Sequence, residues 1–142
     1  MGKINFGRVV IAGLLAGFLM NIFEYVLNGI ILKAQMEDFM SKHNFQDPGG
    51  AFIAVAVLLT FVLGIVLVLL YAMIRPRFGP GPRTAVIAAS LMWFFICIYS
   101  GSIYGLLFGI PAGTTIIGIV WCFVEYLLAG LLGAFVYKEA QT

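Results

Sequence analysis

The sequence predicts an all-α, polytopic membrane protein in which four transmembrane helices form one antiparallel bundle over residues 1–142. Composition is the first reason: hydrophobic residues make up 63% of the chain and charged residues 10%, whereas a soluble domain carries about 25% charged residues. The mean hydropathy of +1.09 agrees. The second reason is the presence of four apolar runs, each longer than the roughly 20 residues that a helix needs to cross the hydrocarbon core of a bilayer.

The predicted spans begin and end at charged residues, prolines or glycines. They cover residues 9–32, 51–74, 84–108 and 114–137. A membrane-spanning strand would be about ten residues long with strict alternation, and these runs are longer and more uniform. The first run has 24 apolar-rich residues, which exceeds the roughly 7–15 residues of a signal-peptide core. We therefore expect it to remain in the mature protein as a helix.

The distribution of basic residues predicts the orientation. Six lysines and arginines lie at the termini or in the middle connection, and two lie in the first loop: Lys3, Arg8, Arg75, Arg77, Arg83 and Lys138 against Lys33 and Lys42. The positive-inside rule then places both termini in the cytoplasm and the loop 33–50 outside the cell (inner) membrane. Met36, Phe39, Met40 and His43 recur in this loop at helical spacing. They predict an extension of the first helix or a short helix on the outer surface.

Two glutamates lie inside the spans, and no lysine or arginine lies within a span to neutralise them. Glu24 is in the first span and Glu125 is near the centre of the fourth. A carboxylate in hydrocarbon is costly, so such a residue marks a functional site by default. Each acid shares one helical face with small and polar residues at steps of three and four. These faces consist of Gly13, Gly17, Asn21, Glu24 and Asn28 in the first helix, and of Thr114, Gly118, Cys122, Glu125, Ala129 and Gly133 in the fourth.

Small residues four apart allow helix backbones to approach closely. We expect four glycines to pack helices together: Gly13, Gly17, Gly118 and Gly133. The simplest geometry packs the first and fourth helices face to face, or each against its copy in a dimer. The two acids would then meet, and without a cation at least one would hold a proton at neutral pH. The candidate binding or proton-relay residues are Glu24, Glu125, Asn21, Asn28, Tyr25 and Tyr126.

Three interpretations of the acids stay open: protonated hydrogen-bonding groups between helices, a proton or cation relay, and a contact to a partner subunit or a lipid head group. The leading function is proton-linked permeation or transport of a small solute. The alternative is a non-catalytic scaffold or accessory subunit of a larger membrane complex. A cavity that reaches the acids would favour transport, and a dry, packed seam would favour the scaffold.

Several classes of function are not expected. Nothing resembles a nucleophile–base set or a phosphate-binding loop, so we predict no catalysis. A net charge of +2 without a basic patch predicts no nucleic-acid partner. The expected partners are the lipid bilayer and either a second copy or a membrane complex.

Metals and cofactors are also not expected, because the sequence has one histidine, His43, and no Cys-x-x-Cys or Cys/His cluster. Cys97 and Cys122 lie in the third and fourth runs. The simplest interpretation makes them small buried hydrophobic residues. They meet, and can form a disulfide, only if these two spans pack at matching depth.

Two sequence features carry a resemblance. The passage from Gly13 to Gly29 and the connection 75–82, Arg-Pro-Arg-Phe-Gly-Pro-Gly-Pro, resemble those of uncharacterised small four-span bacterial membrane proteins, and this resemblance implies no activity. In outline the chain is also similar to the small multidrug-resistance transporters, which are short four-helix proteins with a membrane-embedded glutamate in the first helix. The glutamate in the fourth helix and the long outer loop depart from that pattern, so only the outline is shared.

Overall fold

The computed structural model describes residues 4–46 and 49–139, and this part of the chain is helical without any strand. In chain order the elements are α1 (Phe6–Val26), η1 (Leu27–Ile31), α2 (Lys33–Lys42), α3 (Gly49–Phe78), α4 (Pro82–Trp93), η2 (Phe94–Ser100), α5 (Gly101–Phe108) and α6 (Ala112–Val136). The segments η1 and η2 are π-helical. Lys3, which was counted for orientation, and positions 47–48 of the first loop lie outside the described residues.

The predicted all-helical membrane fold is confirmed. Four continuous helical stretches are long and apolar enough to cross a membrane: Phe6–Ile31, Gly49–Phe78, Pro82–Phe108 and Ala112–Val136. The largest difference from the predicted limits is at the end of α3, which continues through Arg75 and Pro76. The N–H of Gly79 closes this last turn by donating to the carbonyl of Arg75 at 2.8 Å. Arginines in a last turn also complement the helix dipole.

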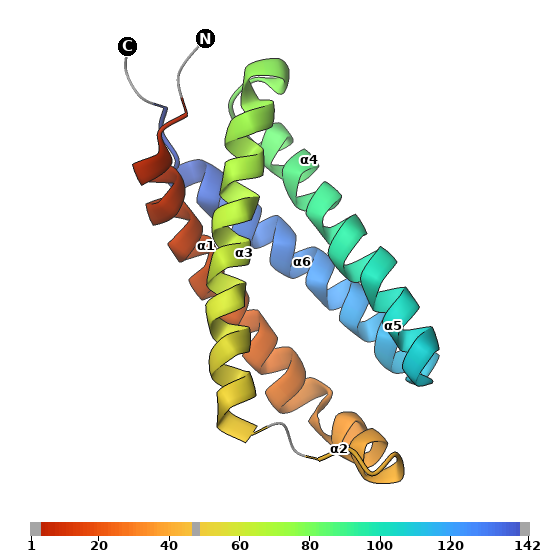
Figure 1. Cartoon of the computed structure of the whole chain (residues 1–142). Coiled ribbons are helices and arrows are strands. Elements are labelled where there is room, and N and C mark those ends of the chain that lie inside the picture. Colours follow the sequence, from red (N-terminus) through yellow and green to blue (C-terminus); the bar gives the residue numbers. More distant parts are fainter. Residues whose placement is uncertain (1–3, 47–48, 140–142) are drawn as a thin grey trace.

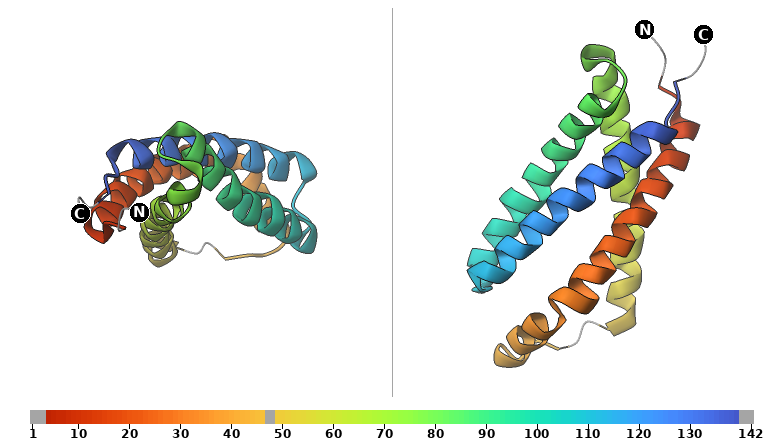
Figure 2. Two further views of the ribbon diagram at one scale, coloured as in Figure 1. Left: turned by 90° about the horizontal axis from the view of Figure 1, so that it is seen from above. Right: turned by 180° about the vertical axis from the view of Figure 1, so that it is seen from behind.

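Neighbouring spans run antiparallel (Figure 1). The start of α1, the turn from α3 to α4 and the end of α6 lie at one end of the bundle, which we call the terminal end. The helix α2 and the turn from α5 to α6 lie at the opposite end, which we call the α2 end (Figures 1 and 2). The helix predicted from the spacing in the first loop is present as α2, which η1 separates from α1, and its Phe39 is buried in contact with His43 and Phe45.

The core lies in the terminal half, and small residues build it. Seven alanines from all four spans are almost fully buried there: Ala12, Ala16, Ala72, Ala85, Ala88, Ala89 and Ala129. A Cβ added at Gly130 of α6 would lie 3.2 Å from the Cβ of Ala89 of α4. In a bilayer, such close approach replaces the hydrophobic effect as the source of helix association.

The first and fourth helices pack against each other as expected, but the glycine row of α1 faces α3 and not the glycine row of α6. A Cβ added at Gly17 would lie 2.8 Å from the Cα of Phe61, and Gly13 lies against the backbone of Ile65. Gly64 of α3 sits opposite both glycines, where a Cβ would lie 2.5 Å from the carbonyl oxygen of Gly13. On α6, Gly133 lies against Val68 of α3 and, more loosely, against Ala16 of α1.

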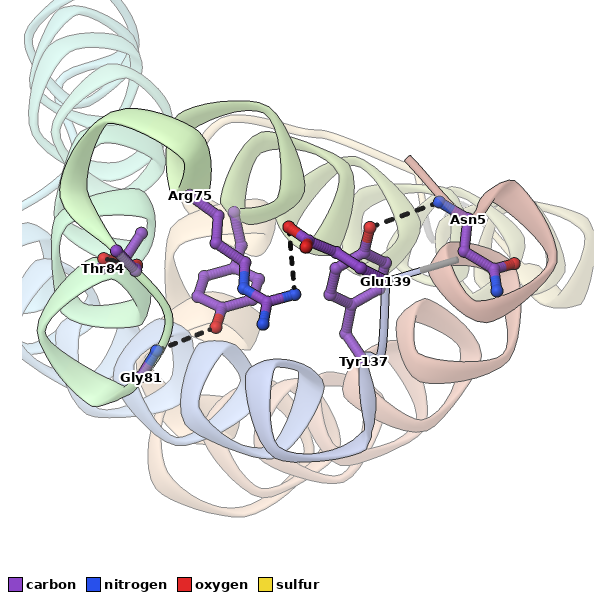
Figure 3. A network of polar contacts seen from close by, with 8 residues as sticks. Asn5, Arg75, Gly81, Thr84, Tyr137 and Glu139 are labelled. Atoms are coloured by element: carbon purple, nitrogen blue, oxygen red, sulfur yellow. Dashed lines mark hydrogen bonds and ion pairs between the residues drawn. The ribbon is translucent and has the colours of Figure 1, made fainter. Parts of the chain in front are cut away.

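A polar cluster ties the chain together at the terminal end (Figure 3). The hydroxyl of Tyr137 accepts a hydrogen bond from the N–H of Asn5 at 3.3 Å, which joins the start of α1 to the end of α6. The Arg75 guanidinium forms an ion pair with Glu139 at 3.2 Å and lies over the ring of Tyr137. Beside it, the hydroxyl of Tyr71 accepts from the N–H of Gly81 at 3.1 Å. These contacts close the terminal end around charged and aromatic side chains.

Candidate functional site

A cavity of about 380 Å³ opens between the spans in the half of the bundle nearer α2. Its walls come from the end of α1 with η1, from η2 with α5, and from the first half of α6. It extends from Glu24 and Cys122, deep in the spans, to Met36 and Ile110 at the α2 end. Most of its lining is apolar, so the few polar groups at its deep end determine what it can bind.

The two acids meet at this deep end. One carboxylate oxygen of Glu24, one of Glu125 and the sulfur of Cys122 all lie within 4.8 Å of one another. They come together because α1 and α6 are antiparallel neighbours that pack against each other. The acids are not equivalent, since Glu24 is half-buried and lines the cavity whereas Glu125 is 1% exposed.

Glu125 lacks a hydrogen-bond partner. Neither of its carboxylate oxygens has one within the described part of the chain. More than nine in ten buried polar groups in proteins are satisfied, and an unsatisfied one costs on the order of 1–3 kcal/mol. A residue that carries such a cost calls for a role beyond packing.

Glu24, in contrast, is held by Asn28. The side-chain amide of Asn28 donates to Oε2 of Glu24 at 2.7 Å and to the main-chain carbonyl of the same residue at 3.1 Å. Asn28 lies in η1, so the π-helical turn carries the residue that orients the acid. The candidate relay residues Glu24, Glu125 and Asn28 therefore share one site.

The other polar residues predicted for this site divide into two groups. Tyr126 is buried and lines the cavity. Asn21 faces α3 instead, because its amide donates to the carbonyls of Gly17 and Val57 at 2.9 and 3.4 Å. Tyr25 is 70% exposed on the outside of the bundle, so its predicted place in the site is wrong. Each tyrosine stands about 100° around its helix from the acid before it; on α6 this step leaves Tyr126 at the cavity wall, whereas on α1 it carries Tyr25 to the exposed face.

The two cysteines add sulfur to this group of side chains. Both are free thiols, and Cys97 and Cys122 are neighbours across the third and fourth spans. The third and fourth spans therefore pack at matching depth here. Sequence reasoning missed that these thiols join the acids, although Cys122 was already on the polar face of Glu125. The carboxylate and thiol donors come from three different spans, which hides them from a search for local motifs.

Gly118 has a different role from the predicted one. A Cβ added there would meet no atom of the described chain within 4 Å, and the glycine lines the cavity. Its predicted helix-packing contact is therefore wrong. The reason is that the cavity lies beside this turn of α6, with Asn28 of η1 and Gly101 of α5 among its other lining residues.

Two tryptophans fix the walls around the site. The indole N–H of Trp121 on α6 donates to the carbonyl of Phe23, next to Glu24, at 3.2 Å. That of Trp93, just before η2, donates to the carbonyl of Ile119 at 2.8 Å. Each bond joins two spans. Together they fix how far α1 and the third span are shifted along the bundle axis relative to α6, close to the acids.

Comparisons with protein-family models, curated proteins and solved structures find no match for this chain. Function is therefore argued from the site. The site combines an apolar cavity, a carboxyl group facing into it, and a second, buried carboxyl group beside two thiols. This chemistry favours a cation over an anion or an apolar ligand.

Proposed function

We propose that this protein is a carrier or channel for a small cationic solute, which enters the cavity from the α2 end and binds at Glu24 and Glu125. The observation that supports this most is that the cavity reaches Glu24, and that Glu24 lies beside a buried carboxyl group without a partner within the described chain. A packed, dry seam would instead have favoured a scaffold. The proposal includes a link to protons, in which solute and protons alternate at the same carboxyl groups.

The charge distribution along the spans supports a cation as the ligand. Within the four described spans, lysine and arginine occur only toward the ends, as Arg8, Arg75, Arg77 and Arg83 do. No basic side chain of these spans accompanies the acids at mid-depth, so an ionised carboxylate there lacks a counter-ion from its own chain. A bound cation would supply it and lower the cost of holding the charge in hydrocarbon.

The two ends of the bundle differ in a way that suits a carrier. The cavity that Glu24 lines is open toward the α2 end, whereas alanines, glycines and the cluster around Arg75 and Tyr137 pack between the spans toward the terminal end. Passage would require the terminal end to open, and π-helical segments such as η1 and η2 are common at functional sites where helices adjust. The count of basic residues orients this proposal: the termini are cytoplasmic and the cavity faces the outside of the cell (inner) membrane.

Flux through purified protein in liposomes tests the proposal. Vesicles that contain a pH-sensitive dye would receive small amines or metal cations outside, with and without an imposed pH gradient. We expect saturable uptake that the gradient drives, and its loss in Glu125→Gln. The matched control is Glu37→Gln, which removes an exposed carboxylate on α2 and should keep full uptake.

Two results would overturn the proposal. The first is the absence of uptake of every cation by protein that remains folded and monodisperse. The second is a stable partner subunit that co-purifies in mild detergent and is needed for every measurable effect. That result would favour the accessory-subunit alternative.

A further inference from the structure

The geometry points to Glu24, Cys122 and Glu125 as the ligands of a divalent transition-metal ion, with Zn²⁺ as the ion that best fits the donors. The inference deepens the proposed function and rests on it in one respect, namely that the bound cation is the cargo. Whether the ion binds depends only on the residues of the site, and binding is measured without any transport assay. The sequence predicted no metal ligands, because it has no Cys-x-x-Cys or Cys/His cluster and because Glu24, distant in the chain, joins Cys122 and Glu125 only in the fold.

The distances fit a zinc site after a small closure. The three ligand atoms lie within 4.8 Å of one another. Zinc binds cysteine sulfur at about 2.3 Å and carboxylate oxygen at about 2.0–2.2 Å with tetrahedral geometry, which puts neighbouring ligand atoms about 3.5 Å apart. Movements of about 1 Å would complete the site, and rotation of the glutamate side chains provides them. Three protein ligands leave the fourth position open, as in zinc sites that exchange what they bind.

The carboxyl group of Glu125 indicates a bound ion independently of the distances between the ligand atoms. It is 1% exposed, and neither of its oxygens has a hydrogen-bond partner among the described residues. One oxygen points into the group formed with Glu24 and Cys122. The two charges of the ion would offset two of the three negative charges that the two carboxylates and the Cys122 thiolate carry when bound, and the one remaining charge is less costly in hydrocarbon than separate anions.

Surrounding contacts support the first ligands. The amide of Asn28 holds Glu24 at 2.7 Å, and such outer contacts typically orient metal-binding carboxylates. The thiol of Cys97 is a neighbour of that of Cys122, where it can donate to the metal-bound sulfur or take the fourth position. The cavity gives the ion a path from the α2 end to this group.

Sulfur determines which metals are selected. Sites of carboxylate and water alone suit Mg²⁺ and Ca²⁺, whereas a thiolate favours Zn²⁺ and other softer ions. We therefore expect Zn²⁺ to bind in the presence of a large excess of Mg²⁺. Co²⁺ should bind at the same place and show the charge-transfer absorption of a cobalt–thiolate bond.

Equilibrium titration of the full chain in detergent, after treatment with a chelator, provides the test. Zn²⁺ should bind once per chain. Glu125→Gln and Cys122→Ser should each weaken binding by about 100-fold or more, because the loss of outer contacts alone costs about 10- to 100-fold. In a Cys97→Ala background, which removes the only other thiol of the chain, the cobalt–thiolate absorption should vanish in Cys122→Ser. Glu37→Gln and His43→Ala change surface groups on or next to α2 and should leave binding intact.

A second measurement keeps all three proposed ligands in place, so it remains informative if Glu125→Gln or Cys122→Ser fails to fold. In a Cys97→Ala background, Zn²⁺ but not Mg²⁺ should slow the reaction of Cys122 with a small neutral thiol reagent. Unchanged labelling, or Zn²⁺ binding that only His43→Ala removes, would overturn the metal site. Saturable uptake of amines without Zn²⁺ binding would refute this inference and keep the proposed function. Zn²⁺ binding without uptake of any cation would support the metal site and refute the proposed function.

Discussion

Gly64→Ala provides the sharpest test of how the bundle is held together. The added Cβ would lie 2.5 Å from the carbonyl oxygen of Gly13 and 2.6 Å from the Cα of Gly17, whereas ordinary contacts begin at 3.4 Å. All these neighbours are backbone atoms, which cannot rotate away, so α1 and α3 must separate by about 1 Å. Overpacking of this kind costs about 1–3 kcal/mol. The higher helix propensity of alanine returns at most about 1 kcal/mol, so we expect a net loss of about 1–2 kcal/mol.

Gly118→Ala is the matched control, because it makes the same chemical change in the middle of a span that has open space beside it. Its expected effect is a gain of a few tenths to about 1 kcal/mol. Unfolding in mixed micelles, driven by a rising fraction of sodium dodecyl sulfate and followed by tryptophan fluorescence, measures both variants. The two free energies of unfolding should differ by about 2 kcal/mol, the sum of the loss and the gain. Equal midpoints would refute the close contact between α1 and α3.

Three further predictions use similar measurements. In a cysteine-less background, Ser41→Cys should react with an impermeant thiol reagent added outside intact cells, and reaction only after the membrane is opened would reverse the proposed orientation. Trp121→Phe removes the hydrogen bond to the carbonyl of Phe23 and should lower the free energy of unfolding by about 1 kcal/mol; an unchanged value would mean that the bond does not hold α1 in place. Glu125→Leu removes a buried carboxyl group and should raise that free energy by about 1–3 kcal/mol, whereas a loss would indicate that the acid serves packing.

The positions of the spans were predictable because a bilayer imposes a simple rule on each helix separately. Length and hydrophobicity fix where a span begins and ends within a few residues, and the structure follows this at every span. The two acids were also predictable as the centre of the candidate site, because a charge in hydrocarbon stands out without any knowledge of the fold.

The neighbours of each helix face were not predictable in the same way. Helical spacing shows that Gly13 and Gly17 share a face, but it does not show that α3 covers that face. The simplest partners at the level of sequence were the fourth helix or a second copy, and the actual partner depends on Gly64, a single glycine in a Val/Leu-rich run. The thiols were missed for a related reason, because Cys97 lies in a different span from both acids, and spacing within one helix does not show which side chains of another helix lie beside it.

The π-helical segments have a consequence for the length of the chain. A π turn closes its hydrogen bonds over five residues instead of four, so each such segment contains one residue more than an α-helix would need. Removing one residue within Leu27–Ile31 or Phe94–Ser100 would restore the α-helical pattern. The helical residues that directly follow the deletion would then turn by about 100° relative to those before it. Such a deletion keeps the anchors at Trp93 and Trp121, which lie before η2 and on another span. Variation by a single residue at these two places would therefore leave the bundle standing and give its cavity a different set of side chains.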